Sequence, residues 1–401
     1  MPKERKRPTE TQGRRRERVL TAGIGLLLGL QTFAMTMLNP FVNLYGMTLA
    51  GGTALLCSVA LAVFGLTNAA LQIVSGHLGD RLGRKPVLLG ALVLLAAGMM
   101  MGYFAESIWG LIAARAVQGC ATISSLAYSW LGSDVDGARI GAATGRAGVL
   151  VAAGSVVAYA GGPALYGLIG ARGLFLTSAF AVAAAFAMTL LLPEDRTRLE
   201  PSARREKLGP KLARAARVPG VGAVCALALA NCAFNVEVFN FVPLRVDALV
   251  GAGGMWMVFV PAVALGVAGM LVASRVTDAR GFTPVAVFSF SCIFASYLAF
   301  LLPGMLGAIA GTTLNMVGYC CVTAGVPAHM SRIVDPAVLG TANGLVQAFI
   351  SLGAFAGPML SAALLATGSE VAMDVASAAL ALACLALAIR LGKRTPAGRA
   401  S

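Results

Sequence analysis

The sequence predicts an all-α polytopic membrane protein with twelve transmembrane helices in two pseudo-repeated six-helix halves. Of its 401 residues, 58% are hydrophobic and only 12% are charged, against roughly 25% charged in soluble proteins. Apolar runs of about 18 residues or more recur along nearly the whole chain, and each can cross about 30 Å of hydrocarbon. One basic segment, interrupted by prolines, divides these runs into six and six.

The expected spans are helices rather than barrel strands, because barrel strands alternate in polarity and need only about ten residues to cross. The twelve spans are Val19–Val42, Ala54–Ser75, Pro86–Ala105, Ser107–Leu131, Ala147–Ile169, Gly173–Leu192, Val221–Leu244, Gly254–Ser274, Phe282–Leu302, Pro303–Ala328, Ala337–Leu365 and Val375–Ile389.

The net charge of +14 is distributed by side of the membrane. Lys and Arg gather in the N-terminal tail, the central segment, the C-terminal tail and residues 81–85, whereas only Arg172 and Arg245 fall on the opposite side. Such asymmetry places both termini in the cytoplasm. We therefore expect a multi-pass protein of the plasma (inner) membrane that touches anionic lipid and does not bind nucleic acid.

The expected parts are a cytoplasmic tail (1–18), a first half (19–192), a cytoplasmic central loop (193–219), a second half (220–390) and a second cytoplasmic tail (391–401).

Two ordered matches indicate an internal repeat. Asp278 and Gly281 follow the eighth span as Asp80 and Gly83 follow the second, 198 residues earlier. In the fifth and eleventh spans, the pair Gly162-Pro163 matches Gly357-Pro358, 195 residues later. Because the two offsets agree within a small insertion or deletion, duplication of a six-helix unit is the favoured interpretation.

The turn expected after the second span carries the most informative motif, a charged string that runs from Gly76 to Lys85. Its pattern, G-x-x-x-D-R-x-G-R-K, resembles the loop between helices two and three of major facilitator superfamily transporters. The resemblance implies a carrier whose two halves rock around a central site. It also implies a cytoplasmic latch for the outward-open state, whose matching residues are Gly76, Asp80, Arg81, Gly83, Arg84 and Lys85.

Physical chemistry is consistent with such a latch. Asp80 could face the N-terminus of the eleventh helix near Ala337–Gly340, where the helix dipole favours a carboxylate. The three basic residues of the motif could pair with Asp134 or Asp136, or with lipid. A plain basic turn on the cytoplasmic side is the alternative. The second copy is degraded, because Ser274 and Phe282 replace a glycine and an arginine.

Two more elements resemble the same family. Arg115-Ala-Val-Gln118-Gly119 is similar to its fourth-helix R-x-x-Q-G element, and an arginine this deep should face the bundle interior or a wet cavity. Arg115 is therefore a candidate for substrate or proton coupling, with a purely structural arginine as the alternative. The fifth span resembles the glycine-rich signature of the antiporter branches through Gly145, Gly154, Gly162 and Pro163, although Ala158 stands where a glycine is expected. Close packing and a proline kink explain these residues equally well.

Buried polar residues suggest where a substrate and protons bind. Four amides lie at matched depth in the first helix of each three-helix unit and are candidates for the substrate cavity: Gln31, Gln118, Asn231 and Asn315. Hydrogen bonding between helices is their alternative role. Glu237 is the only acidic residue inside an expected span, so it is the candidate proton carrier. The alternative for Glu237 is a rim carboxylate paired with Arg245.

These observations favour a secondary carrier of a small molecule over an enzyme. All eight cysteines lie within spans without C-x-x-C or histidine partners, so we expect no metal site, and no cofactor is implied. No glycine-rich phosphate loop with a lysine suggests ATP-driven pumping. The leading hypothesis is proton-coupled efflux of drugs or amphipathic metabolites, most like the twelve-helix drug/proton antiporter branch. The alternative is uptake or facilitated diffusion of a metabolite, such as an anion bound by Arg115. The resemblance implies a monomer.

Overall fold

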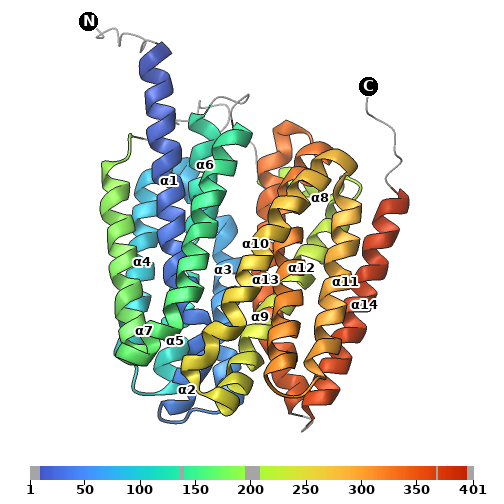
Figure 1. Cartoon of the computed structure of the whole chain (residues 1–401). Coiled ribbons are helices and arrows are strands. Elements are labelled where there is room, and N and C mark those ends of the chain that lie inside the picture. The colour runs from blue at the N-terminus through green and yellow to red at the C-terminus, as the bar shows by residue number, and fades with distance from the viewer. Residues whose placement is uncertain (1–9, 136–139, 195–207, 367–368, 395–401) are drawn as a thin grey trace, which may run out of the picture.

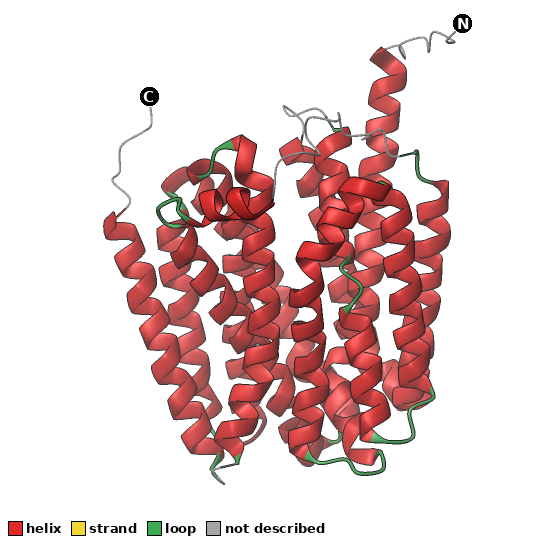
Figure 2. Cartoon of the chain, turned by 180° about the vertical axis from the view of Figure 1, so that it is seen from behind, coloured by secondary structure: helices red, strands yellow, loops and turns green. Residues whose placement is uncertain are grey.

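The computed structural model describes residues 10–135, 140–194, 208–366 and 369–394. Within these ranges, all of the named secondary-structure elements are helices (Figures 1 and 2). The helices are α1 (Glu10–Leu38), η1 (Asn39–Phe41), α2 (Val42–Thr48), α3 (Ala54–Leu82), α4 (Arg84–Tyr103), α5 (Ile108–Gly119), α6 (Ile123–Asp134), α7 (Ile140–Leu191), α8 (Leu208–Ala216), α9 (Val221–Val250), η2 (Ala252–Gly254), α10 (Met255–Arg280), α11 (Phe282–Phe300), α12 (Gly304–Ile333), α13 (Pro336–Leu365) and α14 (Glu370–Arg394).

The described part of the chain contains ten helices long and apolar enough to cross a membrane. Two structural details reconcile this number with the twelve expected spans. The fifth and sixth spans are continuous in α7, where Gly170 alone has non-helical dihedral angles, with φ +67°. The fourth span is divided into α5 and α6, each of 12 residues and too short to be counted alone.

The division of the fourth span follows directly after the R-x-x-Q-G element. A Cβ on Gly119 would collide with Thr67 and with the carbonyl oxygen of Phe64, so α5 touches α3 at this point. Asn68 of α3 donates a hydrogen bond of 3.1 Å to the Gly119 carbonyl, which satisfies an oxygen at the helix end. Because non-helical backbone at membrane depth must be buried or line a wet cavity, this break marks the interior of the first half.

Figure 1 shows two bundles of helices side by side, with α1–α7 in one and α8–α14 in the other. In the first bundle, α1 packs closely on α7, because a Cβ on Gly154 would collide with the carbonyl oxygen of Gly29. In the second bundle, α9 packs on α13 in the same way, because a Cβ on Gly357 would collide with the carbonyl oxygen of Ala233. Small residues allow such close backbone contact between membrane helices.

The two charged motifs are mostly helical, which corrects the expected loops. Helix α3 runs on to Leu82, and α10 runs on to Arg280, so each motif forms the last turns of a helix. The turn itself is a single glycine in each half. Gly83 has φ +95° and Gly281 has φ +84°, a conformation that glycine adopts without a steric penalty. The next helix begins at the following residue in both cases.

Several other boundaries differ from the sequence expectation. Helix α1 begins at Glu10, within the expected tail, and the central segment contains α8. Helix α14 begins at Glu370, five residues before the expected span, and continues to Arg394. Pro163 lies inside α7, whose non-helical dihedral angles fall at Gly170.

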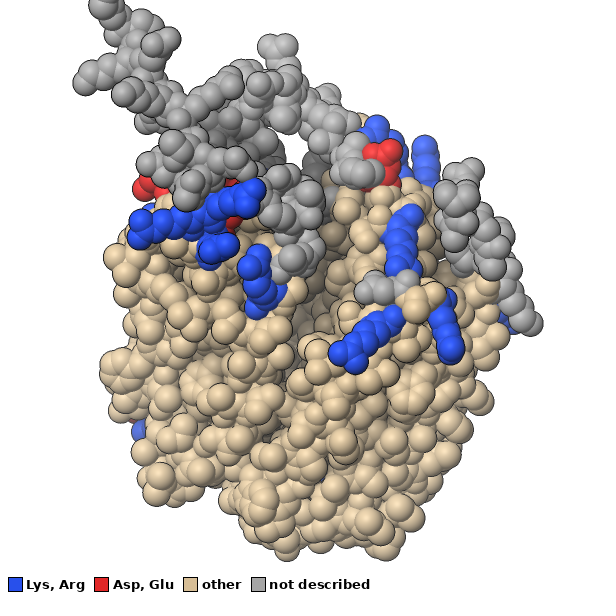
Figure 3. All heavy atoms as spheres, turned by 45° about the horizontal axis from the view of Figure 1, so that its top comes forward, with Lys and Arg blue, Asp and Glu red and all other residues tan. Residues whose placement is uncertain are grey.

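The surface is divided by polarity. Helices α1 and α14 have their terminal ends on the same side of the molecule, where N and C are marked in Figure 1. Lys and Arg side chains gather at this end, whereas most of the lower wall is uncharged (Figure 3). Large apolar side chains are exposed on the helices, among them Leu168 and Phe104, as expected for helices that face lipid.

Candidate functional site

Glu237 lies fully buried in the second half, with 0% of its surface exposed. Its carboxyl group accepts two hydrogen bonds of 2.7 Å, from the Tyr297 hydroxyl on α11 and from the Ser377 hydroxyl on α14. It is therefore not a solvated rim residue, and it is not paired with Arg245. Glu237 instead joins α9 to two neighbouring helices through hydroxyl donors.

Arg245 holds a different carboxylate, Asp374, at 2.9 Å, and it also contacts the exposed Glu370 at 2.9 Å. Asp374 is only 2% exposed and lies one turn before Ser377 on α14. Sequence reasoning missed Asp374, because the expected twelfth span began one residue later. Its acidic character next to an apolar run was the available signal.

Asn240 connects the two halves of the molecule. The Asn43 amide of α2 donates to the Asn240 side-chain oxygen at 2.7 Å and to its backbone carbonyl at 2.5 Å. The Asn240 amide donates to Ser58 of α3 at 3.0 Å and to Ser361 of α13 at 2.5 Å. All four residues are buried. We call Asn43, Ser58, Asn240 and Ser361 the amide cluster; sequence reasoning missed it, because two of its members belong to each half.

Aromatic rings join the halves beside the amide cluster. Phe239 of α9 stacks on Tyr159 of α7, with ring centroids 5.7 Å apart, and on Phe259 of α10 at 5.4 Å. Figure 1 shows α2, which carries Asn43, at the end opposite the two termini. At the terminal end, by contrast, Figure 3 shows a shaded furrow between the two lobes. The amide cluster and the rings thus hold the halves together at the end away from the termini.

Arg115 is only 2% exposed and lies inside the first half. Its Nη1 donates to Gln118 at 2.8 Å, and its guanidinium lies over the Phe64 ring at 4.8 Å. The Nε atom has no hydrogen-bond partner, and no carboxylate pairs with Arg115 within the described ranges. Because Arg115 is buried, an anion can reach its guanidinium only if the surrounding helices separate.

The four amides do not form one cluster. Gln118 donates to the Gly98 carbonyl of α4 at 3.0 Å, and Gln31 accepts from Ser124 of α6 at 3.3 Å. Asn231 donates to the Tyr319 carbonyl of α12 at 3.3 Å, while its side-chain oxygen has no partner. Asn315 is buried and its amide nitrogen has no partner. Gln118, Gln31 and Asn231 therefore each make a hydrogen bond between helices, whereas Asn231 and Asn315 each keep one buried polar atom without a partner.

The residues of the charged motif from Gly76 to Lys85 differ in burial and in the groups that they contact. Lys85 is buried and donates to the carbonyls of Leu190 at 3.1 Å and Leu192 at 2.7 Å, at the end of α7. It thus caps a helix C-terminus, where a cation is favoured, and it also pairs with Glu194 at 3.7 Å. Asp134 pairs with Arg16 of α1 at 3.1 Å. The side chains of Asp80, Arg81 and Asp278, together with Gly76, lie outside the described residues, as do those at 336–338 and 340 and the whole of Asp136.

The fifth-span residues act mainly in packing. Gly154 makes the close contact with α1, whereas a Cβ on Gly145 would meet nothing within 4 Å, and one on Gly162 would make ordinary contact with Met37 at 3.4 Å. The described part of the chain contains no group of His, Cys, Asp and Glu able to hold a metal ion.

Comparison with known proteins agrees with this architecture. The family model of the Major Facilitator Superfamily matches residues 24–331. The inner membrane transport protein YajR of Escherichia coli (strain K12) is 33% identical over 182 residues, which are 45% of this chain and 40% of that protein. An uncharacterized transporter of Buchnera aphidicola, BU466, is 29% identical over 161 residues, 40% of this chain and 41% of that one. The matches thus span about two fifths of these relatives.

Solved structures extend the likeness of the fold to nearly the full length. The nucleoside transporter NupG covers 94% of this chain and 100% of its own, with a TM-score of 0.70 and 13% identity. A bacterial homolog of the human lysosomal transporter Spinster covers 94% of this chain and 96% of its own, with a TM-score of 0.72 and 15% identity. With the family match across most of the sequence, these findings show that the chain belongs to the major facilitator superfamily and is a multi-pass membrane transporter rather than an enzyme.

Proposed function

We propose that this transporter exports a small amphipathic molecule, such as a drug or metabolite, in exchange for protons, by alternating access. We further propose that it does so as a monomer in the inner membrane, the location that the name of the YajR relative states for that protein, with both termini in the cytoplasm. The buried Glu237, held by two hydroxyl groups and, among the residues that the structure describes, by no cation, is the observation that carries the proton-coupled part of this proposal.

Hydrogen-bond chemistry explains how protonation of Glu237 could change the packing of the helices around it. An ionised carboxylate only accepts, so both the Tyr297 and Ser377 hydroxyls can donate to it. A protonated carboxyl group carries a donor of its own, so one of the two hydroxyls must turn or give up its bond. Proton binding would therefore change contacts among α9, α11 and α14. The other charged groups of this region, Arg245, Asp374 and Glu370, already pair with one another.

The same stretch of α9 supports a link between the proton and the contact of the two halves. Glu237 lies one helical turn before Asn240, which binds Asn43 and Ser58 of the first half. Phe239, between them, stacks on Tyr159 of that half. We propose that rearrangement around Glu237 shifts this turn and weakens the amide cluster, so that the end away from the termini opens when the proton state changes.

The first test is transport of fluorescent compounds into inside-out vesicles under an imposed pH gradient, with a panel of cationic, neutral and anionic compounds. Glu237→Gln should abolish gradient-driven accumulation but retain substrate exchange in the absence of a gradient, because only the coupling step needs a titratable group. Glu106→Gln, at an exposed position between α4 and α5, is the matched control and should behave as the wild type.

Two further variants keep the test informative if Glu237→Gln folds poorly. Tyr297→Phe and Ser377→Ala each remove one hydroxyl donor and should weaken, without abolishing, the dependence on the gradient. Asp80→Asn tests the latch separately. Transport that is indifferent to the gradient and to Glu237 would overturn proton coupling.

A second candidate function is facilitated movement or uptake of an anionic metabolite. The observation in its favour is the buried Arg115, whose Nε lacks a partner and which no carboxylate neutralises within the described ranges. Selective transport of the anionic compounds in either direction, without a gradient and with loss in Arg115→Gln, would favour this function over proton-coupled export.

A further inference from the structure

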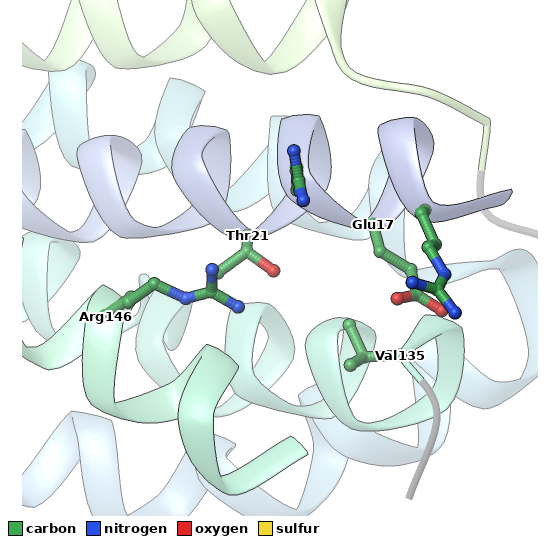
Figure 4. Close-up of a pocket in the computed structure, with 6 residues that line it drawn as sticks. Glu17, Thr21, Val135 and Arg146 are labelled. Carbon is green, nitrogen blue, oxygen red and sulfur yellow. The ribbon is translucent and has the colours of Figure 1, made fainter. Parts of the chain in front are cut away.

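A basic pocket lies at the terminal end of the first half, away from Glu237 and from the amide cluster. It has a volume of about 210 Å³ and lies between α1, the end of α6 and the start of α7 (Figure 4). Its lining residues are Arg14, Glu17, Arg18, Thr21, Val135 and Arg146. The lining thus contains three arginines and one glutamate, so it has an excess of positive charge.

Helix geometry brings these side chains together. Arg14, Arg18 and Thr21 are spaced four and three residues apart, which places them on one face of α1. Figure 4 shows Arg146 reaching from α7 toward Thr21, with Glu17 and Val135 farther along the same space. Arg16 points elsewhere, since it pairs with Asp134 at 3.1 Å and donates to the Glu194 carbonyl. The acidic end of α6 is thereby tied to α1 outside the pocket lining.

The pocket lies where the charged beginnings of α1 and α7 meet their apolar spans. The lipid-facing apolar surface of α1 begins immediately after Arg18, at Val19, which is 48% exposed, and continues at Leu26, which is 47% exposed. On α7, the apolar span begins at Gly145, next to Arg146. Arginines at the ends of membrane helices extend toward the headgroup layer, so these three point to the depth of lipid phosphates.

The size and chemistry of the pocket suit a phosphodiester. One water molecule occupies about 30 Å³ in the liquid, so a pocket of about 210 Å³ admits a group of several heavy atoms. Arginine binds phosphate through two parallel N–H donors, and it does so more specifically than lysine. Thr21, which is buried, adds a hydroxyl on the same face of α1.

We propose that this pocket binds the phosphate of an anionic phospholipid headgroup, such as that of phosphatidylglycerol, and that the lipid joins the beginnings of α1 and α7. The bound lipid would hold together the ends of two helices that also pack through Gly29 and Gly154. This proposal is independent of the substrate and of proton coupling.

The test is native mass spectrometry of the purified transporter, which counts lipids retained from mixed phosphatidylglycerol and phosphatidylcholine. The wild type should retain phosphatidylglycerol selectively. The double variant Arg18→Gln/Arg146→Gln should lose at least fivefold of this retention. Arg275→Gln/Arg280→Gln removes the same charge from exposed residues of α10 in the second half and should retain the lipid.

Three outcomes would overturn the proposal. Equal retention of the two lipids by the wild type, which needs no variant, would show that the pocket does not select anionic lipid. Equal loss of phosphatidylglycerol from the two double variants would show that general surface charge, and not this pocket, retains the lipid. Displacement of the lipid by millimolar inorganic phosphate would identify a site for the free anion instead.

Discussion

Arg245 lies between two carboxylates in very different surroundings. Asp374 is 2% exposed, whereas the Glu370 side chain is 63% exposed, and the Arg245 guanidinium also lies 4.7 Å from the centre of the Phe241 ring. Loss of one partner from a buried pair commonly costs about 3–5 kcal/mol, because the other charge stays buried without compensation. We therefore expect Arg245→Gln to lower the thermal unfolding midpoint of the purified protein clearly.

A second substitution tests the cause of that loss. Arg245→Gln/Asp374→Asn leaves no buried charge at this position, so it should recover much of the stability lost in the single variant. Glu370→Gln alone should cost no more than about 1 kcal/mol, as for other exposed ion pairs. A double variant no more stable than Arg245→Gln would show that the arginine stabilises the protein through packing on Phe241 rather than through Asp374.

The chemistry at the level of single residues was only partly predictable. Glu237 could be identified from sequence because it is the single acid within an expected span, but its partners depend on how α9, α11 and α14 are rotated. Asp374 was missed because hydropathy ends a span at a charge, whereas the helix begins earlier: the Ser369 hydroxyl accepts a hydrogen bond from the Ala372 N–H at 3.1 Å and caps it.

Close contact of helix backbones distinguishes one glycine of α7 from another. A Cβ on Gly154 would collide with the Gly29 carbonyl of α1, which cannot move without separating the two helices, whereas a Cβ on Gly145 meets nothing. Gly154→Ala should therefore lower the yield and melting temperature of the folded transporter, with an overpacking cost of about 1–3 kcal/mol. Gly145→Ala should be neutral or stabilising, since alanine favours helix by about 1 kcal/mol. Equal effects of the two changes would contradict this assignment of close contact.

Element boundaries show what hydropathy can and cannot predict. In the part of the chain that the structure describes, ten helices are long and apolar enough to span a membrane. Gly76–Leu82 was expected as a loop, because charged residues leave the hydrocarbon. Charge does not end a helix at the membrane surface; here the positive φ of Gly83 does. The break between α5 and α6 was not predictable either, since it depends on the fit of Gly119 against α3.

The whole molecule is held in its present arrangement by contacts between halves that are similar in architecture. Helix α3 meets α13 through Gly65, where a Cβ would lie 2.6 Å from the Ser351 carbonyl oxygen, and Ser351 donates to Asn68 at 2.8 Å. Farther toward the end opposite the termini, Asn240 completes the contact through Asn43 and Ser58. Besides these hydrogen bonds, the halves are joined by the stacked rings of Tyr159 and Phe239.

Asn240→Ala should accordingly shift the equilibrium from the present arrangement, which is closed at the end away from the termini, toward an arrangement that is open there. A hydrogen bond between membrane helices contributes about 0.6 kcal/mol on average, so loss of the bonds to Asn43 and Ser58 should shift the ratio of states roughly fivefold to tenfold. Spin labels at exposed positions of that end, Met47 and Leu249, in a variant without native cysteines, should report longer distances. Asn235→Ala is the matched control, since this buried amide of α9 donates to Met316 of its own half. If both variants lengthen the distances equally, a general loosening of α9 explains the shift, and Asn240 has no special part in holding the halves together.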